Sequence, residues 1–210
     1  MIDLYTSTTP NGQRASLMLE ETGLPYTGHW IDLSRGEQRQ PAFLKLNPSG
    51  RIPVLVDHDS GKEKPLVLTQ SVAIVLYLAE KTGKLLPEDP VGRARVYEWM
   101  QFHATDISTT LFNAFYLQRH SLFGLSLAAS ILRKRVLGLY RHFDAQLATH
   151  PYLAGPDYTI ADVIVLPGAL ALEKRLQGYR HLTHWLTELK QRPTVRQGLA
   201  ASSPESGHAD

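Results

Sequence analysis

The sequence of 210 residues contains no cysteine. Disulfide bonds, thiolate metal sites and a catalytic protein thiol are therefore excluded. The sequence also lacks an apolar run near the ~20 residues that a membrane-spanning helix needs. Its first residues lack the charged start and apolar stretch of a signal peptide. We therefore predict a cytoplasmic protein that does not enter the membrane.

An excess of charge of one sign is missing as well. The 22 Lys and Arg residues and the 20 Asp and Glu residues give a formal net charge of +2, and they are spread along the chain without a basic stripe. Nucleic acid therefore has little electrostatic reason to bind. Apolar residues make up 43% of the sequence, which is enough for a buried core in one domain or two small ones.

The first dozen residues are the most informative part of what is present. The apolar residues Ile2 and Leu4 alternate as in a strand, and hydroxyl side chains, Pro10-Asn11-Gly12 and a helical pattern follow. The free N–H groups at the start of a helix, with small polar side chains beside them, suit an anion such as a thiolate or a carboxylate. Two later segments, residues 51–54 and 68–71, are candidates for the rest of such a site.

Strand and helix patterns alternate over the first part of the chain. Strands are predicted at residues 2–5, 26–33, 52–56 and 65–68, and helical segments at 13–22, 43–44 and 71–81, the last stopped by Gly83. The order β-α-β followed by β-β-α is that of a thioredoxin-like unit. Residues 85–90 form a proline-bounded linker.

Every pattern after the linker is helical. Helices are predicted at residues 91–117, 125–148, 160–174 and 182–191, and Pro193 is expected to end the last one. Thr159 and Asp162 have the spacing of a capping box. We therefore predict a first domain at 1–83, a linker at 84–90, a helical domain at 91–200 and a disordered tail at 201–210.

These segments resemble a cytosolic glutathione transferase over nearly the whole chain. The Thr9-Pro10-Asn11-Gly12 start, with Gln38 and Arg51-Ile52-Pro53, is most similar to the bacterial Nu-class branch and its fungal nitrogen-regulator relatives. The resemblance implies an α/β N-terminal thioredoxin-like domain followed by an all-α helical-bundle domain. It also implies a homodimer that uses glutathione as co-substrate.

The resemblance further implies a role for each matching residue. Thr9 and Asn11 would contact the glutathione sulfur. A cis Pro53 would let the backbone of Ile52 pair with the cysteinyl part. Thr69 or Gln70, together with Ser71, would bind the γ-glutamyl carboxylate, and Gln38 and Arg51 would bind the glycyl end.

The chemistry of the thiol supports this reading independently. Free thiols are mostly protonated at neutral pH, so the enzyme must favour the thiolate, which is the nucleophile. Tyr5 lies within the strand and is interpreted as a core residue. None of the remaining candidates is a general base near pH 7, so they would act as hydrogen-bond donors to the sulfur; they are Ser7, Thr8, Thr9 and Asn11. Whether Thr8 or Thr9 faces the sulfur stays open.

Simpler interpretations remain for several of these residues. Asn11 is also a typical helix cap, and Ser71 is a candidate cap for the helix that it begins. Pro53 is also compatible with an edge-strand proline, because most X-Pro bonds are trans. Hydroxyls such as that of Thr8 are often satisfied within turns.

One departure from the Nu-class pattern concerns residue 70. That branch usually has Glu-Ser where this chain has Gln70-Ser71, so the glutathione ammonium needs another counter-charge. In classes with Gln-Ser an aspartate of the partner subunit supplies it, and Asp106 is the candidate here, although a solvated helix charge is the alternative. Candidates for the second-substrate pocket are Phe102, His103 and Thr110, with Phe115 and Tyr116 as further neighbours.

The predicted function is that of a glutathione-dependent transferase. Its thiolate would attack an electrophile, or a disulfide or peroxide, which are equally compatible with these residues. No metal site is predicted. The alternative is a non-catalytic glutathione-binding or regulatory protein on the same scaffold. A structural interaction domain without glutathione is disfavoured by the intact Ile52-Pro53 and Gln70-Ser71 segments.

Overall fold

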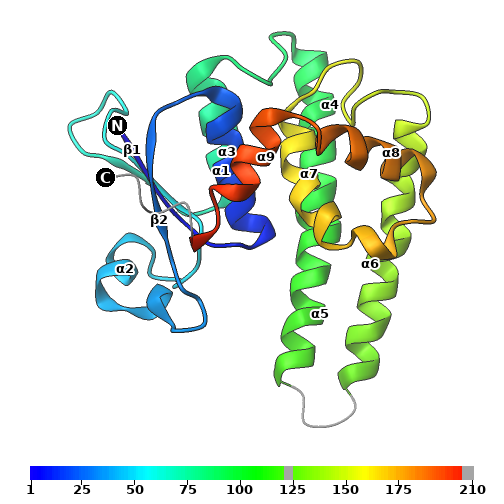
Figure 1. The fold of residues 1–210 in the computed structure, drawn as a ribbon, viewed down its shortest axis with the longest axis horizontal. Helices are drawn as coiled ribbons and strands as arrows, with labels where there is room; N and C mark the ends of the chain where they lie inside the picture. Colours follow the sequence, from blue (N-terminus) through cyan, green and yellow to red (C-terminus); the bar gives the residue numbers. More distant parts are fainter. Residues whose placement is uncertain (121–124, 205–210) are drawn as a thin grey trace. The chain divides into compact units, whose positions relative to one another are not determined.

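The computed structural model describes residues 1–120 and 125–204. They form two compact units, one made of Met1–Leu85 and the chain from Leu189 onward, the other of Leu86–Glu188 (Figure 1). The sequence-based prediction placed residues 91–200 in the helical domain, whereas the chain from Leu189 onward belongs to the first unit. Residues 205–210 of the predicted tail lie outside the described residues, and Ser202 within it is fully buried.

The first unit contains the four predicted strands in a mixed sheet. The strands are β1 (Ile2–Thr6), β2 (Tyr26–Trp30), β3 (Val54–Asp57) and β4 (Leu66–Leu68). Their order is β2-β1-β3-β4, with β1 parallel to β2 and the other pairs antiparallel. The predicted thioredoxin-like arrangement is confirmed, although β2 ends three residues earlier and β3 begins two residues later than the periodicity indicated.

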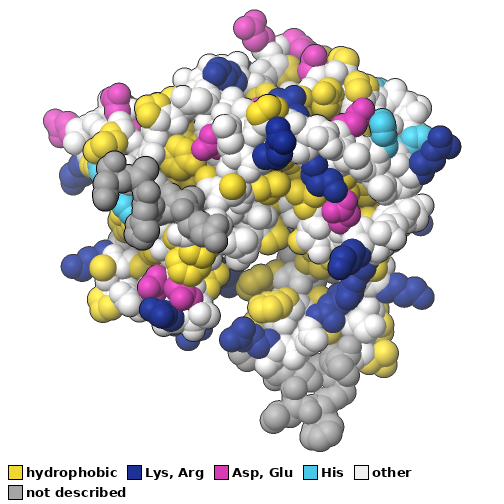
Figure 2. Space-filling view, viewed as in Figure 1, with side chains coloured by type: hydrophobic (Ala, Val, Ile, Leu, Met, Phe, Trp, Pro, Cys, Tyr) yellow, Lys and Arg dark blue, Asp and Glu magenta, His cyan; other side chains and the backbone are white. Residues whose placement is uncertain are grey.

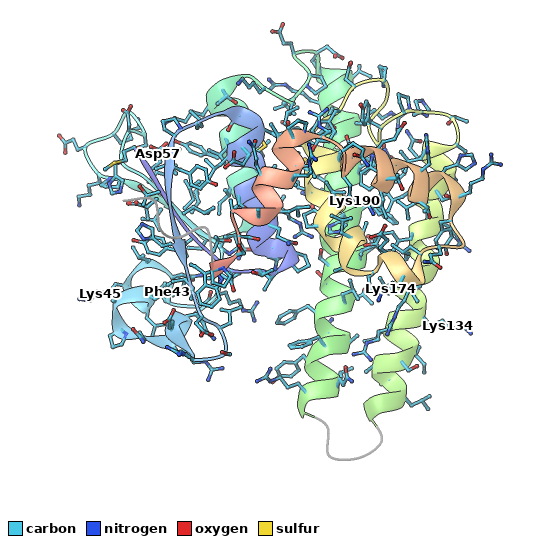
Figure 3. All side chains as sticks on the ribbon, viewed as in Figure 1. Phe43, Lys45, Asp57, Lys134, Lys174 and Lys190 are labelled. Atoms are coloured by element: carbon cyan, nitrogen blue, oxygen red, sulfur yellow. The ribbon has the colours of Figure 1, made fainter. Side chains whose placement is uncertain are left out.

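Helices cover both faces of this sheet. Leu4 pairs with Leu55, and both are fully buried on the face toward α1 (Pro10–Thr22), which packs against α3 (Ser71–Thr82). Tyr5 pairs with Val54 on the other face, where Phe43 of α2 (Pro41–Leu46) packs against them (Figure 3). The short 3-10 helix η1 (Glu37–Arg39) precedes α2. The alternation of side chains along β1 and β3 thus supplies two small cores.

The end of the chain returns to the first unit as α9 (Pro193–Ala200). The expectation that Pro193 ends a helix was wrong: it is the first residue of a helix, where the missing N–H and the fixed φ of proline are favourable. α9 packs closely on α1 (Figure 1). A methyl group on Gly198 would lie 2.4 Å from the Cα atom of Leu17, so the two backbones meet there directly. The Ser16 hydroxyl donates to the Gly198 carbonyl at 2.7 Å.

The second unit is helical, as predicted. It contains α4 (Pro90–Gln101), the π-helical segment η2 (Phe102–Ser108), α5 (Thr109–His120), α6 (Leu125–Leu147), α7 (Ile160–Ala171), the 3-10 turn η3 (Glu173–Arg175) and α8 (Arg180–Leu189). The predicted segment 91–117 therefore contains a π-helical turn, a feature that is often found at functional sites. Within the described part of the chain, every helix is too short or too polar to span a bilayer. Basic and acidic side chains are interspersed on the face drawn in Figure 2.

The capping box at the start of α7 is confirmed. The Thr159 hydroxyl accepts the Ala161 N–H at 3.3 Å, and the Asp162 carboxylate accepts the Thr159 N–H at 3.0 Å. Asp162 is fully buried and also accepts the indole N–H of Trp185 at 3.1 Å. Burial raises the pKa of Asp162 to about 6, against the opposing effect of these donors.

Candidate functional site

The start of α1 is organised by Thr9. Thr9 is the N-cap in extended conformation, and its Oγ1 atom accepts the Gly12 N–H at 3.2 Å. The alternative interpretation of Asn11 as the cap is therefore wrong. Oγ1 acts here as an acceptor, and within the described residues the hydroxyl hydrogen of Thr9 has no acceptor. Thr9 thus combines a structural bond with one donor that is still available.

Gly12 lets this helix start approach the end of β1. A Cβ atom at position 12 would lie 2.2 Å from the Ser7 carbonyl oxygen and 2.6 Å from the Thr6 hydroxyl oxygen. Both contacts are closer than any side chain tolerates, and the first involves rigid backbone. Gly12 is therefore required by close approach, and it brings the α1 N-terminus against the loop of hydroxyl residues.

Thr8 is used differently from Thr9. Its hydroxyl donates to the backbone carbonyl of Ser202 at 3.0 Å. A hydroxyl has a single hydrogen, so Thr8 has no donor left for a ligand in this arrangement. Of the two threonines that the sequence left open, Thr9 is the one that keeps a donor.

Arg14 joins the starts of two helices, and the sequence analysis missed it. Its side chain is buried, with 3% of the residue exposed. Its Nη1 atom lies 2.6 Å from Oδ1 of Asn11 and 3.4 Å from Oγ of Ser71. The signal was available, because Arg14 precedes the buried Leu17 and Met18 by three and four residues and so lies on the apolar face of α1.

The Ile52-Pro53 peptide bond is cis, as the resemblance implied, and the trans alternative is wrong. The loop before it is held by Asn47, whose amide nitrogen donates to the Arg51 carbonyl at 2.6 Å. The Ile52 side chain packs against the small core around Phe43. The backbone of Ile52 is thus held just before the start of β3.

Ser71 is the first residue of α3 and not its cap. The N-cap is Gln70, whose side chain makes no capping hydrogen bond. The alternative interpretation of Ser71 as the cap is therefore wrong. A helix start without a side-chain cap has N–H groups that suit a carboxylate.

Gln38 and Arg51 lie in the loops that frame this part of the first unit. Gln38 is in η1, and its Oε1 atom is buried without a partner among the described residues. Gly50, with a φ of +60°, brings its backbone close to the Gln38 carbonyl. Arg51 is exposed. The roles of both at the glycyl end of glutathione stay predictions.

Tyr5 is not an activated phenol. Its ring stacks on His29 with centroids 4.5 Å apart and packs edge-on against Phe43. Burial, with the nearby Asp3 carboxylate, raises the pKa of Tyr5 above its ordinary value. The phenol therefore stays protonated at neutral pH, in line with its interpretation as a structural residue.

The residues predicted for the second substrate lie on η2 and the start of α5. His103 is 1% exposed, stacks on Phe143 and lies with Nδ1 3.2 Å from the Ser108 hydroxyl, so it belongs to the core of the second unit. Asp106, on the same segment, is half-buried and accepts the Thr105 hydroxyl at 2.9 Å, and its role as the counter-charge for the glutathione ammonium stays a prediction. The other two, Phe102 and Thr110, are half-buried. Binding of a second substrate by these residues stays a prediction.

Across residues 1–120 and 125–204, no group of three or more His, Cys, Asp or Glu side chains is arranged to hold a metal ion. The candidate donors around the start of α1 are hydroxyl, amide and guanidinium groups. Such groups bind anions.

Comparison with known proteins extends this picture. Residues 8–81 match the family model described as glutathione S-transferase, N-terminal domain. The chain is 34% identical over 205 residues to the disulfide-bond oxidoreductase YfcG of Escherichia coli K12, covering 95% of this chain and 94% of that protein. It is 32% identical to the disulfide-bond oxidoreductase YghU of the same organism, covering 94% of this chain and 73% of that protein.

Solved structures share the fold. A glutathione transferase family member from Pseudomonas fluorescens Pf-5, with two glutathione bound, superposes with a TM-score of 0.84 at 29% identity, covering 94% of this chain and 92% of that one. A glutathione transferase from Burkholderia graminis, with two glutathione molecules bound per subunit, gives a TM-score of 0.84 at 31% identity, covering 98% and 89%.

Proposed function

This chain belongs to the glutathione transferase family, and we propose that it is a glutathione-dependent enzyme that binds glutathione in its first unit. The observation that carries the proposal is the start of α1. There Thr9 keeps a hydroxyl donor, and Asn11 lies beside it, linked through Arg14 to Ser71 at the start of α3. These groups offer donors to a sulfur and to a carboxylate in one part of the unit.

The proposed catalytic role of Thr9 and Asn11 is to stabilise the thiolate. A thiol with an ordinary pKa of about 8.5 is mostly protonated at neutral pH. Hydrogen bonds from Thr9 and Asn11, with the N-terminal dipole of α1, favour the charged form and lower the pKa of the bound thiol. Neither residue removes the proton, which leaves to solvent. The nucleophile comes from glutathione, because the chain contains no cysteine.

The remaining contacts of glutathione follow the same proposal. The backbone of Ile52, fixed before the cis Pro53, pairs with the cysteinyl part of the tripeptide. The uncapped start of α3, with Gln70 and Ser71, binds the γ-glutamyl carboxylate. Gln38 and Arg51 bind the glycyl end.

Reduction of a small disulfide is the reaction that we favour. The glutathione thiolate attacks one sulfur of the disulfide, a new S–S bond forms as the old one breaks, and the leaving thiolate takes a proton from solvent. A second glutathione thiolate then attacks the mixed disulfide, which releases the second thiol and leaves oxidised glutathione. The names of YfcG and YghU, and the two glutathione molecules in both solved structures, support this reaction. Transfer of the thiolate to a carbon electrophile is the second candidate.

The proposal also covers the assembly, the location and the second-substrate residues of the protein. The protein acts as a homodimer in the cytoplasm. Phe102 and Thr110 are retained as second-substrate residues. His103 is left out, because its 1% exposure leaves no surface for a substrate.

Turnover assays test the proposed function. The purified protein is mixed with reduced glutathione and either a small disulfide or a model aryl electrophile, and oxidised glutathione or the conjugate is measured. Turnover of the disulfide supports the favoured reaction, and turnover of the electrophile alone supports the second candidate. Glutathione binding in calorimetry without turnover of either would establish the non-catalytic alternative instead.

A further inference from the structure

We propose that Arg14 is a positioning residue that orients the Asn11 amide, so that its N–H₂ group faces the glutathione sulfur. This inference rests on the proposed function and extends it. Arg14 lies on α1 with 3% of the residue exposed, whereas Asn11, three residues earlier on the same helix, is exposed. A ligand therefore reaches Asn11, and Arg14 acts through it.

The orientation follows from the donor inventory of the two groups. A guanidinium has only donors, whereas an amide has a carbonyl acceptor at one end and two N–H donors at the other. The Nη1 atom of Arg14 lies 2.6 Å from Asn11 Oδ1. The opposite orientation of the amide would bring two donors together at that distance. Arg14 thus selects the one orientation in which the Asn11 Nδ2 donors point away from the guanidinium.

The second contact of Nη1 fixes the position of the guanidinium. The same atom lies 3.4 Å from Oγ of Ser71, which is 57 residues away in the sequence and begins α3. The positive charge therefore lies between two helix starts, each of which carries a partial positive charge. This concentration of positive potential favours an anionic thiolate and carboxylate over their neutral forms. Arg14 thereby links the sulfur end of the proposed site to the γ-glutamyl end.

Two substitutions of Arg14 test the inference. Arg14→Met removes the donor and the charge, and Arg14→Lys keeps one cationic donor but not the planar fork. The pKa of the bound glutathione thiol is measured from the ultraviolet absorbance of the thiolate, together with kcat and KM. For Arg14→Met we expect the thiol pKa to rise by about one unit, and kcat to fall about tenfold with a smaller change in KM. Arg14→Lys should raise the thiol pKa less, and lower kcat less, than Arg14→Met does.

Arg192→Met is the matched control. Arg192 also pairs with a buried group in the first unit, since its Nη2 atom lies 3.1 Å from the Glu21 carboxylate. This change should lower the melting temperature without moving the thiol pKa. If Arg14 had only a structural role, Arg14→Met would likewise lower the melting temperature without moving the thiol pKa.

A double-mutant cycle with Asn11 decides the mechanism. If Arg14 acts through Asn11, then Arg14→Met combined with Asn11→Ala should be little worse in kcat than Asn11→Ala alone. Strictly additive effects, or an unchanged thiol pKa in Arg14→Met, would overturn the inference and leave the proposed function standing. If Arg14→Met fails to fold, the same cycle with Arg14→Lys is decisive by the same two criteria. A wild-type protein that forms no bound thiolate and has no turnover would overturn both proposals.

Discussion

The hydroxyl of Thr8 donates to the carbonyl of Ser202 at 3.0 Å, across 194 residues of sequence. The neighbouring Thr9 accepts the Gly12 N–H instead and keeps its hydroxyl hydrogen. Two adjacent threonines of the same chemistry therefore have different tasks. Thr8 ties the C-terminal segment to the loop before α1, and Thr9 presents a donor at the helix start.

The first prediction separates these two threonines by kinetics. Thr9→Ala and Asn11→Ala, each made alone, should reduce turnover about ten- to hundredfold, corresponding to roughly 1–3 kcal/mol for one donor lost at the reacting atom. The double substitution should reduce turnover at least as much as either single change. Binding of glutathione, measured by calorimetry, should weaken less than turnover, because the lost bonds are strongest to the thiolate.

Thr8→Val is the matched control for this experiment. It keeps the shape of the side chain and removes the bond to Ser202. It should lower the free energy of unfolding by about 1 kcal/mol and leave turnover nearly unchanged. A loss of turnover confined to Thr8→Val would reverse the assignment of the two residues.

A second prediction concerns the contact between Gly198 and Leu17. Gly198→Ala should destabilise the protein by about 1–3 kcal/mol, because the added methyl group would overlap the α1 backbone and force α9 away. Denaturant unfolding measures this effect. Gly138→Ala in α6 is the control, since a methyl group there meets nothing within 4 Å. That change should stabilise the protein by up to about 1 kcal/mol, as is usual for glycine in a helix. Equal effects at both positions would contradict the close packing of α9 on α1.

Local sequence patterns predicted much of the first unit. The four strands, the order of elements, the cis Pro53 and the end of α3 before Gly83 all follow from short-range signals or from the resemblance. The capping box of Thr159 and Asp162 is also a local signal, because both of its bonds lie within three residues.

The errors have physical causes that differ from one place to another. Thr9 and Asn11 are both good caps, but Pro10 could have decided between them, since proline is favoured in the first turn after the cap. Pro193 was ambiguous, because proline both ends helices and begins them. The π-helical turn over η2 left no mark in the pattern of apolar residues.

The position of Arg14 on the apolar face of α1 is a local signal, but its role could not be assigned from local sequence. A charged residue on the apolar face of a helix is unfavourable until its partners are known. One of these partners, Ser71, is 57 residues away and comes close only when α1 and α3 pack together. The part of the candidate site that depends on tertiary packing was therefore the part that sequence reasoning missed.

A third prediction concerns the acid sensitivity of Asp57, at the end of β3. This carboxylate is fully buried and accepts the Lys81 ammonium and the Tyr77 hydroxyl, each at 2.6 Å. Burial alone would raise the pKa of Asp57, but the bonds from Lys81 and Tyr77 outweigh it and hold the pKa below its ordinary value. The unfolded chain therefore binds more protons in acid, so this stabilisation is complete above a pH of about 4 and is lost as the pH falls through the folded-state pKa.

Asp57→Asn should therefore lower the free energy of unfolding by about 1.5–3 kcal/mol at neutral pH. The mutant should also lose less stability than wild type as the pH falls below about 4. Urea unfolding over a series of pH values measures both effects. Asp59→Asn is the control, because only the backbone of that exposed residue joins the cluster. Parallel stability curves for wild type and Asp57→Asn would contradict the proposed linkage.

The last prediction concerns the counter-charge for the glutathione ammonium. Gln70, at the cap of α3, is neutral, and a buried unpaired ammonium is costly. Asp106 of a second copy of the chain is the carboxylate that we predict for this task. Asp106→Asn should weaken glutathione binding by roughly 1–3 kcal/mol in calorimetry, the range for a hydrogen bond to a charged group. Gln70→Glu should partly restore binding in that variant, and should do less in the wild-type background, where the charge is already supplied. Thr105→Val is the control, because it removes the hydroxyl that donates to Asp106 but keeps the carboxylate. Strictly additive effects of Asp106→Asn and Gln70→Glu would show that the two residues act independently and that Asp106 is a solvated helix charge.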